Sequence, residues 1–216
     1  MPIIISEKNS IASKFIAQLR DATIQSDRLR FRTNVERLGQ IFAYELSKTF
    51  NYVEQEVETP LGIATVSVPE DRIVIASILR AGLPLQNGIL SYLDEADNAF
   101  ISAYRKHHKD GTFEIELEYV TCPDLNGCTL ILTDPMMATG ASFSAALKAL
   151  REHGKPKKIH LVTIIASAAG VAHLERTHSN AKIWTGAVDE ELTAKSYIVP
   201  GLGDAGDLLF GEKLQD

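Results

Sequence analysis

The chain has 216 residues, 45% of them hydrophobic, and its 28 acidic and 22 basic residues give a net charge of −6. This length can bury one sizeable core, and the negative charge argues against a nucleic-acid-binding protein with a broad basic surface. No apolar run is long enough to span a membrane, and the patch at residues 3–5 is too short for the core of a signal peptide.

The first predicted element is an amphipathic helix over residues 34–49, because Val35, Leu38 and Phe42 follow helical spacing. Arginines cluster just before and within it, at Arg28, Arg30, Arg32 and Arg37. They form either a solvated face or a contact with a second subunit. The sequence Thr-Pro-Leu-Gly at 59–62 predicts a turn.

From residue 73 onward, apolar strands alternate with helices. Strands are predicted over 73–79, 99–104, 129–133, 159–166 and 182–188, and helices over 83–93, 142–153 and 170–177. Unbroken apolar strands separated by helices are typical of a parallel sheet covered on both faces. Residues 113–119 instead alternate apolar residues with glutamates, which predicts a half-exposed antiparallel or edge strand. We therefore expect an α/β fold with a doubly wound, mainly parallel sheet over about 70–190.

The segment from Leu130 to Ser142 is the most informative part of the chain. An apolar strand leads to Asp134, small and hydroxylic residues follow, and a helical pattern begins. Backbone N–H groups there can converge on a phosphate, because the first turn of a helix leaves its donors unpaired and its dipole favours an anion. A carboxylate beside such a loop suits a sugar phosphate, whose ribose hydroxyls it can bind. The alternative is an ordinary strand-to-helix turn capped by Ser142.

A second turn, Arg80-Ala81-Gly82, follows another apolar strand and is expected at the same edge of the sheet. Its amides and the Arg80 guanidinium suit a second phosphate group, although pairing of Arg80 with a surface carboxylate is the alternative. Arg105 ends the next strand, also at this edge. The histidines that follow it do not predict a metal site, because adjacent side chains diverge and no carboxylate has a useful spacing.

Residues 201–206 match the dinucleotide-binding pattern GxGxxG, but the match fails on length. Pro200 separates them from the preceding apolar residues, and only residues 207–216 follow. That is too short for the helix, second strand and ribose-binding acid that such a site needs. What remains is a glycine-rich loop with exposed backbone groups and the carboxylates of Asp204 and Asp207.

These segments together resemble the type I phosphoribosyltransferases, and residues 134–142 are similar to the signature of the uracil phosphoribosyltransferase family in particular. Pro135 stands where most other type I members carry a second acid. Residues 78–82 resemble the family's pyrophosphate loop, which often holds a non-proline cis peptide. Residues 197–207 resemble its uracil-binding segment, in which main-chain atoms match the donors and acceptors of the pyrimidine and discriminate against cytosine.

The resemblance implies an enzyme of pyrimidine salvage that converts uracil and 5-phospho-α-D-ribose 1-diphosphate to UMP and diphosphate. It implies that the catalytic residues are Asp134, Arg105 and Asp204. The implied contacts to the sugar diphosphate are Arg80, Ala81, Gly82, Arg105, Asp134, Pro135, Met136, Met137, Ala138, Thr139, Gly140, Ala141, Ser142 and Asp204. The implied contacts to uracil are Tyr197, Ile198, Gly203, Asp204 and Ala205. The implied cofactor is Mg²⁺, held mainly through diphosphate and water, with Asp204 as its candidate protein contact.

We expect a single phosphoribosyltransferase domain over 1–216, in which N-terminal helices and residues 189–211 form a hood over the base. A homodimer or higher homo-oligomer is expected, with the apolar face of 34–49 and the 113–119 strand available to a partner. Cys122 and Cys128 fit neither a zinc site nor a CxxC pair, so free thiols and a cytoplasmic location are expected. No nucleic-acid or membrane partner is expected. Regulation by GTP, and the identity of a general base, are left open by the residues.

Two alternative functions are weighed against this one. A phosphoribosyltransferase for another base, such as a purine, is disfavoured by Pro135 and by the 197–207 segment. An RNA-binding regulator on the same fold would need a basic face, for which the net charge gives no support.

Overall fold

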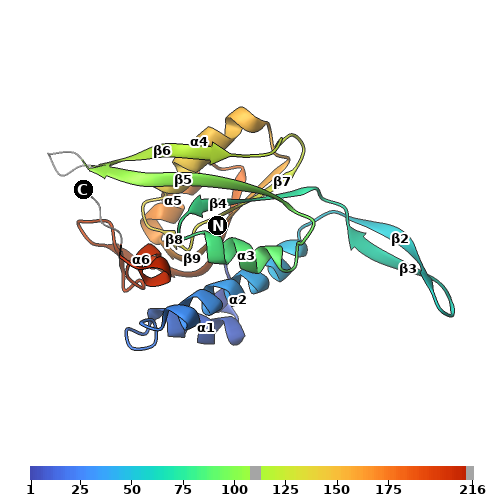
Figure 1. The fold of residues 1–216 in the computed structure, drawn as a ribbon, viewed down its shortest axis with the longest axis horizontal. Coiled ribbons are helices and arrows are strands. Elements are labelled where there is room, and N and C mark those ends of the chain that lie inside the picture. The colour runs from blue at the N-terminus through green and yellow to red at the C-terminus, as the bar shows by residue number, and fades with distance from the viewer. Residues whose placement is uncertain (108–112, 213–216) are drawn as a thin grey trace.

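The computed structural model describes residues 1–107 and 113–212, and for 103–107 and 113–117 it describes the backbone alone. Within these residues, eight strands form one mixed sheet (Figure 1). The order is β1 (Ile3–Ile4), β10 (Ala181–Asp189), β9 (Lys158–Ser167), β7 (Thr129–Thr133), β4 (Ile73–Leu79), β5 (Asp97–His107) and β6 (Phe113–Thr121). The eighth strand, β8 (Met136–Met137), pairs with β9 past the end of β7.

The direction in which strands are added reverses between β4 and β7, in the middle of the sheet. From β4 the chain adds β5 and β6 on one side, then returns to β7 and adds β9 and β10 on the other. In this sheet β1, β10, β9, β7, β4 and β5 pair in parallel, and β6 pairs antiparallel with β5 at the edge. The sequence prediction of a doubly wound, mainly parallel sheet with an antiparallel edge is confirmed.

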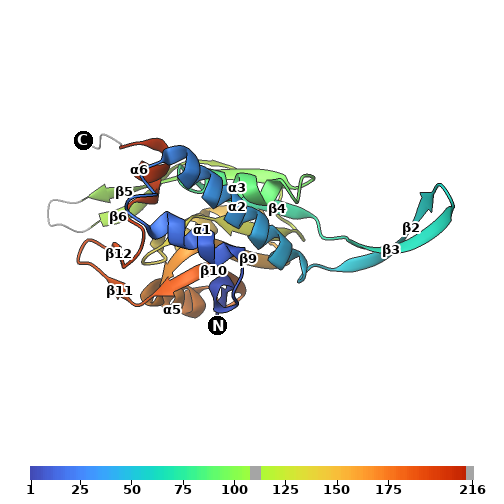
Figure 2. The ribbon, with the colours of Figure 1, turned by 90° about the horizontal axis from the view of Figure 1, so that it is seen from below.

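Two groups of helices cover the sheet, one on each face (Figures 1 and 2). The first group is α1 (Ile11–Arg20), α2 (Arg28–Ser47) and α3 (Leu83–Leu90), and the second is α4 (Ala141–Leu150) and α5 (Ala168–Thr177). Alternate residues of the central strands feed the two cores. In β4, Ile75 packs with the first group, while Val74 and Ala76 pack with the second.

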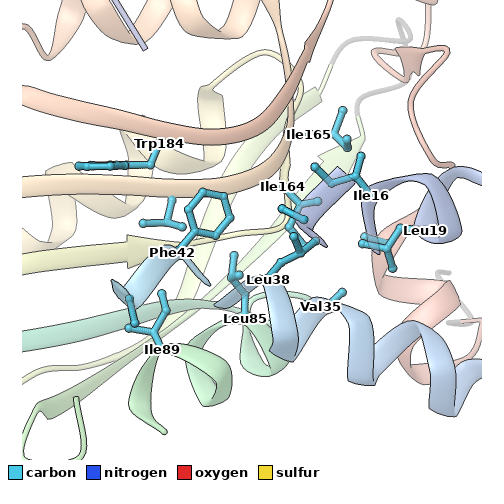
Figure 3. Packing of buried hydrophobic residues seen from close by; sticks show 14 of the residues in the cluster. Ile16, Leu19, Val35, Leu38, Phe42, Leu85, Ile89, Ile164, Ile165 and Trp184 are labelled. Carbon is cyan, nitrogen blue, oxygen red and sulfur yellow. The ribbon is translucent and has the colours of Figure 1, made fainter. Parts of the chain in front are cut away.

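The larger core lies between the first helix group and the sheet. Figure 3 shows Phe42 of α2 between Trp184 of β10 and Ile89 of α3, with Leu38 one turn away along α2. Leu38, Phe42 and Ile89 have no solvent-exposed surface. The apolar face of the helix predicted over 34–49 is therefore buried inside the chain, and the expectation that it contacts a second subunit is wrong.

Capping decides where α1 and α2 begin. The side chain of Asp27 accepts a hydrogen bond from the N–H of Arg30 at 3.0 Å, so α2 starts at Arg28, before the expected residue 34. Ser10 caps α1 in the same way through the N–H of Ala12, at 3.3 Å. Helix α1 is one of the expected N-terminal helices, whose bounds the sequence analysis does not give, and it buries Ala12, Ile16 and Leu19 on one face.

A long β-hairpin, β2 (Tyr52–Thr59) and β3 (Gly62–Pro69), projects away from the rest of the molecule (Figures 1 and 2). We call it the arm. The turn expected at 59–62 is its tip, but its strands were not predicted, because they alternate without a buried face. Exposed apolar side chains lie along it: Tyr52, Val53, Val57, Leu61, Ile63 and Val66.

The arm is fixed at its base. The N–H of Glu70 donates to the carbonyl of Asn51 at 2.9 Å, which joins its two ends. The carboxylate of Asp71 accepts hydrogen bonds from the N–H of Asn51 and from the hydroxyl of Thr129, the latter at 2.9 Å, and lies 3.4 Å from Nζ of Lys158. The arm is therefore attached at the amino ends of β4, β7 and β9.

The remaining elements are short. They are η1 (Ile5–Glu7), η2 (Arg151–His153), β11 (Glu191–Leu192), β12 (Ile198–Val199) and α6 (Ala205–Phe210). β11 and β12 form an antiparallel pair of their own. Within the described ranges, no helix combines the length and the apolar character needed to cross a membrane.

His160 of β9 is a buried titratable group inside the fold, with 3% of its surface exposed. Its Nδ1 accepts a hydrogen bond from the indole N–H of Trp184 at 3.0 Å, so the neutral ring carries its proton on Nε2. Burial and the charges of Lys182 and Lys158 lower the pKa of His160 to about 4, against a smaller opposing effect of Asp71. The histidine is therefore neutral in the folded chain at physiological pH.

This burial predicts a pH dependence of stability. The unfolded chain takes up a proton at His160 below about pH 6.5, whereas the folded chain does so only near pH 4, so stability is lost as the pH falls between these values. His160→Asn keeps an acceptor for Trp184 but cannot titrate. Urea unfolding of both proteins at several pH values should show a loss smaller by roughly 3 kcal/mol in the variant. Parallel pH profiles would contradict the assignment.

Candidate functional site

The turn after β4 and the turn after β7 lie side by side where the strand order reverses. Gly82 connects them: a Cβ atom at this position would lie 2.7 Å from the carbonyl oxygen of Thr133, the last residue of β7. Only glycine permits so close an approach. The N–H of Gly82 donates to the carbonyl of Ile78 at 2.9 Å, which closes the turn. The Leu79–Arg80 peptide is cis, as the family resemblance implies.

Asp134 follows β7 directly, at the carboxyl edge of the sheet. Its N–H donates to the carbonyl of Val162 at 3.2 Å, and its Oδ1 accepts from the N–H of Met136 at the same distance. The carbonyl of Pro135 accepts hydrogen bonds from the N–H groups of Ile164 and Ile165 at 3.0 and 3.1 Å. The Asp134 carboxylate is thus held at the edge where open α/β sheets bind ligands. Asp134 is partly exposed to solvent there.

The loop that follows is supported from β9 and α5. Ser167 ends β9 and caps α5: its hydroxyl donates to the carbonyl of Ala138 at 2.5 Å and accepts from the N–H of Gly170 at 2.9 Å. Gly140 has a φ of 77°, a left-handed conformation that favours glycine, and α4 begins at the next residue. The Ser167 contact and the left-handed Gly140 therefore fix the backbone that leads into α4.

This loop has the chemistry of a phosphate site. Gly140 occupies the cap position of α4 and has no side chain with which to satisfy the N–H groups of the first turn. Those groups and the helix dipole favour an anion. The hydroxyl of Thr139 lies within the loop and accepts from the N–H of Ala141 at 3.3 Å. Ser142 lies inside the helix, so the alternative in which it caps an ordinary turn is wrong.

The C-terminal segment 189–211 is tied to α1 by an ion pair between Arg20, whose side chain is 23% exposed, and the buried Asp189. Both Nη atoms of Arg20 donate to the carboxylate of Asp189 at 2.7 Å, and the N–H of Gly201 donates to the same carboxylate at 2.9 Å. Nη1 of Arg20 also donates to the carbonyl of Gly201 at 2.9 Å. Burial alone would raise the pKa of Asp189, but the hydrogen bonds from Arg20 and Gly201 outweigh it and lower the pKa.

The expected uracil-binding residues lie in this segment. Ile198 and Ala205 are buried, at 4% and 3% exposure, whereas Tyr197 is 45% exposed. Gly203 has a φ of 92°. The carboxylate of Asp204 accepts from the N–H of Asp207 at 3.1 Å and so caps α6. This helix was not predicted from the sequence.

Helix α6 reaches the turn after β4. Oδ1 of Asp207 lies 3.7 Å from Nη2 of Arg80, and the Phe210 ring centroid lies 5.9 Å from the guanidinium carbon. From the other side, Arg32 of α2 donates to the carbonyl of Leu209 at 2.8 Å. Arg32 thus has a partner within the chain, which neither interpretation of the arginine cluster foresaw. The Arg80 turn accordingly contacts both the end of β7 and the C-terminal segment.

For Arg105 and the histidines after it, the structure describes little beyond the backbone. The backbone of Arg105 pairs with Ile115 in the β5–β6 ladder, and its side chain lies outside the described part of the chain. His107 ends β5, and His108 lies outside the described residues. Among the residues that are described, no group of three or more histidines, cysteines or carboxylates could hold a metal ion.

The residues that hold the site together were not predicted from the sequence. Arg20 and Asp189 are 169 positions apart in the chain, and Ser167 supports a loop 29 positions away. Residues so far apart in the sequence form no local motif from which their contact could be predicted. The Asp-x-x-Asp spacing of 204 and 207 is a usable signal for the helix cap, because Asp204 accepts from the N–H three residues on.

Comparison with known proteins identifies relatives along nearly the whole chain. The model of the family described as "Uracil phosphoribosyltransferase" matches residues 5–212. A uracil phosphoribosyltransferase of Porphyromonas gingivalis is 49% identical over 211 residues, covering 97% of this chain and 98% of that protein. One from Thermococcus gammatolerans is 36% identical over 212 residues, covering 97% and 93%. The solved structure of the AQ2163 protein from Aquifex aeolicus has a TM-score of 0.88, 30% identity and 100% coverage of each chain.

The Arg20–Asp189 pair predicts a contrast between a largely shielded ion pair and an exposed one. Asp189→Ala leaves the largely shielded Arg20 guanidinium, whose side chain is 23% exposed, and the Gly201 N–H without their acceptor, and should lower the free energy of unfolding by about 2–3 kcal/mol. Asp97→Ala is the matched control, because the Asp97 and Arg72 side chains are 50% and 45% exposed, and should cost less than about 1 kcal/mol. Urea unfolding measures both, and equal losses would refute the role of Asp189.

Proposed function

The chain belongs to the uracil phosphoribosyltransferase family, and we propose that it acts in pyrimidine salvage by making UMP and diphosphate from uracil and 5-phospho-α-D-ribose 1-diphosphate. The observation that carries this proposal is that the Arg80 turn meets both the end of the strand that precedes Asp134 and the C-terminal segment. One small molecule can contact all three. Such a molecule must have a phosphate for the loop at 136–142 and a second charged group for Arg80.

The 5-phosphate is assigned to the loop before α4. Its ligands would be the first-turn N–H groups of α4 and the hydroxyls of Thr139 and Ser142. The carboxylate of Asp134 would hold the ribose hydroxyls and favour the positive charge that develops on the sugar as diphosphate leaves. Fixing the sugar between these two groups supplies orientation, so no covalent intermediate is needed.

Diphosphate is assigned to the turn after β4. The amides of Ala81 and Gly82 and the guanidinium of Arg80 would bind its oxygens, and Arg105 would join them from β5. Mg²⁺ suits this arrangement, because it commonly binds substrate phosphates, water and one or two carboxylates rather than a complete protein cage. Asp204 would contact the ion through water. The metal would neutralise charge on the leaving diphosphate.

Uracil is assigned to the C-terminal segment. Main-chain atoms of Ile198 and Ala205, with Gly203 and Tyr197 beside them, would match the acceptor, donor and acceptor along one edge of the base. The Arg20–Asp189–Gly201 contacts keep this backbone fixed, which supports readout by main-chain groups. Cytosine would leave such groups unpaired, and unpaired buried polar groups discriminate strongly.

A homo-oligomer is part of the proposal, with the arm as its contact. The arm carries exposed apolar residues at its tip, where Leu61 and Ile63 are 100% and 71% exposed. Exposed apolar surface concentrated on a projecting hairpin marks a protein–protein contact. The hydrogen bonds of Asp71 at its base keep the arm extended without a partner.

A cytoplasmic location is also proposed. Cys122 and Cys128 are both free thiols, and burial raises the pKa of each to about 11. Protonated thiols are poor nucleophiles, so neither cysteine is reactive at neutral pH. Unpaired, unreactive thiols are typical of proteins in a reducing compartment.

The enzyme assay that tests this function uses labelled bases. The wild-type protein with the sugar diphosphate and Mg²⁺ should convert uracil to UMP and turn over cytosine and hypoxanthine very poorly. Asp134→Asn removes the charge that holds the ribose and should lower kcat/KM for the sugar diphosphate by roughly a hundredfold. Comparable turnover of cytosine would overturn the base assignment, and wild-type kinetics in the variant would remove the role of Asp134.

The arm predicts a change in assembly. Leu61→Glu combined with Ile63→Glu places charges on its apolar tip and should convert the oligomer to a smaller species in sedimentation velocity. Leu29→Glu is the control, because Leu29 is 68% exposed at the start of α2, away from the arm. It should sediment as the wild type does. A wild-type monomer, or the same change in both variants, would refute the arm as the contact.

A further inference from the structure

The carboxylate of Asp207 has one buried oxygen, Oδ1, that accepts no hydrogen bond from the described residues. A buried carboxylate oxygen without a donor is costly. The nearest cationic group is Arg80, whose Nη2 lies 3.7 Å away, slightly beyond hydrogen-bonding distance. A small shift of either side chain would complete the contact.

Arg80 gains a defined position from the same helix. Asp207 and Phe210 are three residues apart on α6 and therefore lie on one face. The guanidinium lies between them, with the Phe210 ring centroid 5.9 Å from its central carbon. The Arg80 side chain is 46% exposed even with these neighbours, so without them it would sample several rotamers. A carboxylate at one edge leaves the other N–H donors free for an anion.

The helix that holds Asp207 is itself fixed at both ends. Asp204 caps its first turn through the N–H of Asp207, at 3.1 Å. Arg32 donates to the carbonyl of Leu209 near its last turn, at 2.8 Å, and Leu209 is fully buried. The carboxylate therefore meets Arg80 from a rigid element rather than from a loop. It also belongs to the segment to which the uracil contacts are assigned.

We propose that Asp207 is a positioning residue that orients the Arg80 guanidinium toward the diphosphate of the sugar substrate. It thereby links the C-terminal segment to the turn after β4, so that a displaced α6 weakens diphosphate binding. The proposal rests on the function assigned above, because it takes the ligand of Arg80 to be diphosphate. Asp207 need not touch the substrate, and its effect passes through Arg80.

The test measures diphosphate binding as well as turnover. Asp207→Ala should weaken binding of inorganic diphosphate with Mg²⁺, followed by calorimetric titration, by about tenfold, because Arg80 loses its charged partner. The KM for the sugar diphosphate should rise by a similar factor, while the KM for uracil changes little. Asp207→Asn keeps the shape and one acceptor oxygen, should fold like the wild type, and should give an intermediate loss. Asp94→Ala, at an exposed aspartate after α3, is the matched control.

A double-mutant cycle separates positioning from a merely structural role. Arg80→Lys removes the planar group that Asp207 would orient, so adding Asp207→Ala to it should cause little further loss of diphosphate affinity. Additive losses, a rise confined to the KM for uracil, or wild-type affinity in both Asp207 variants would overturn the proposal. A wild-type protein that binds diphosphate but does not convert uracil would instead contradict the function, and the binding cycle would still decide the role of Asp207.

Discussion

The constraint on which the site depends is the reversal of strand order between β4 and β7. Because these neighbouring strands are parallel, their carboxyl ends finish side by side, and the turns that follow them must share one edge of the sheet. Gly82 lets those turns touch, since any side chain there would collide with the Thr133 carbonyl. The loop at 134–142 and the Arg80 turn are thus brought together by topology before any ligand contributes.

The third part of the candidate site is the C-terminal segment, which contacts of the N-terminal helices hold in place. Arg20, the last residue of α1, fixes Asp189 and Gly201 in one hydrogen-bonded network, so the C-terminal segment is anchored beside the sheet. Helix α2 holds α6 in a similar manner through Arg32. The N-terminal helices therefore position residues that are distant from them in sequence and close to the site.

The central sheet could be predicted from the sequence because its strands are continuously apolar and are followed by turns that carry Gly82, Asp134 and Gly140. The arm could not be predicted, because neither face of its strands is buried against a core and its sequence therefore lacks a consistent apolar face. In the candidate site, local motifs predict the turn after Asp134 and the turn at Arg80. The Arg20–Asp189 ion pair and the hydrogen bond from Ser167 to Ala138 could not be predicted, since each joins residues far apart in the chain.

The attachment of the arm has a consequence for how the sheet is used. Asp71 and its partners Thr129 and Lys158 lie at the amino ends of β4, β7 and β9, whereas Gly82 and Asp134 follow the carboxyl ends of β4 and β7. The strands act as rigid spacers between these two edges. Substitutions in the arm should accordingly change its contacts with a partner and leave the geometry of the Arg80 and Asp134 turns as it is.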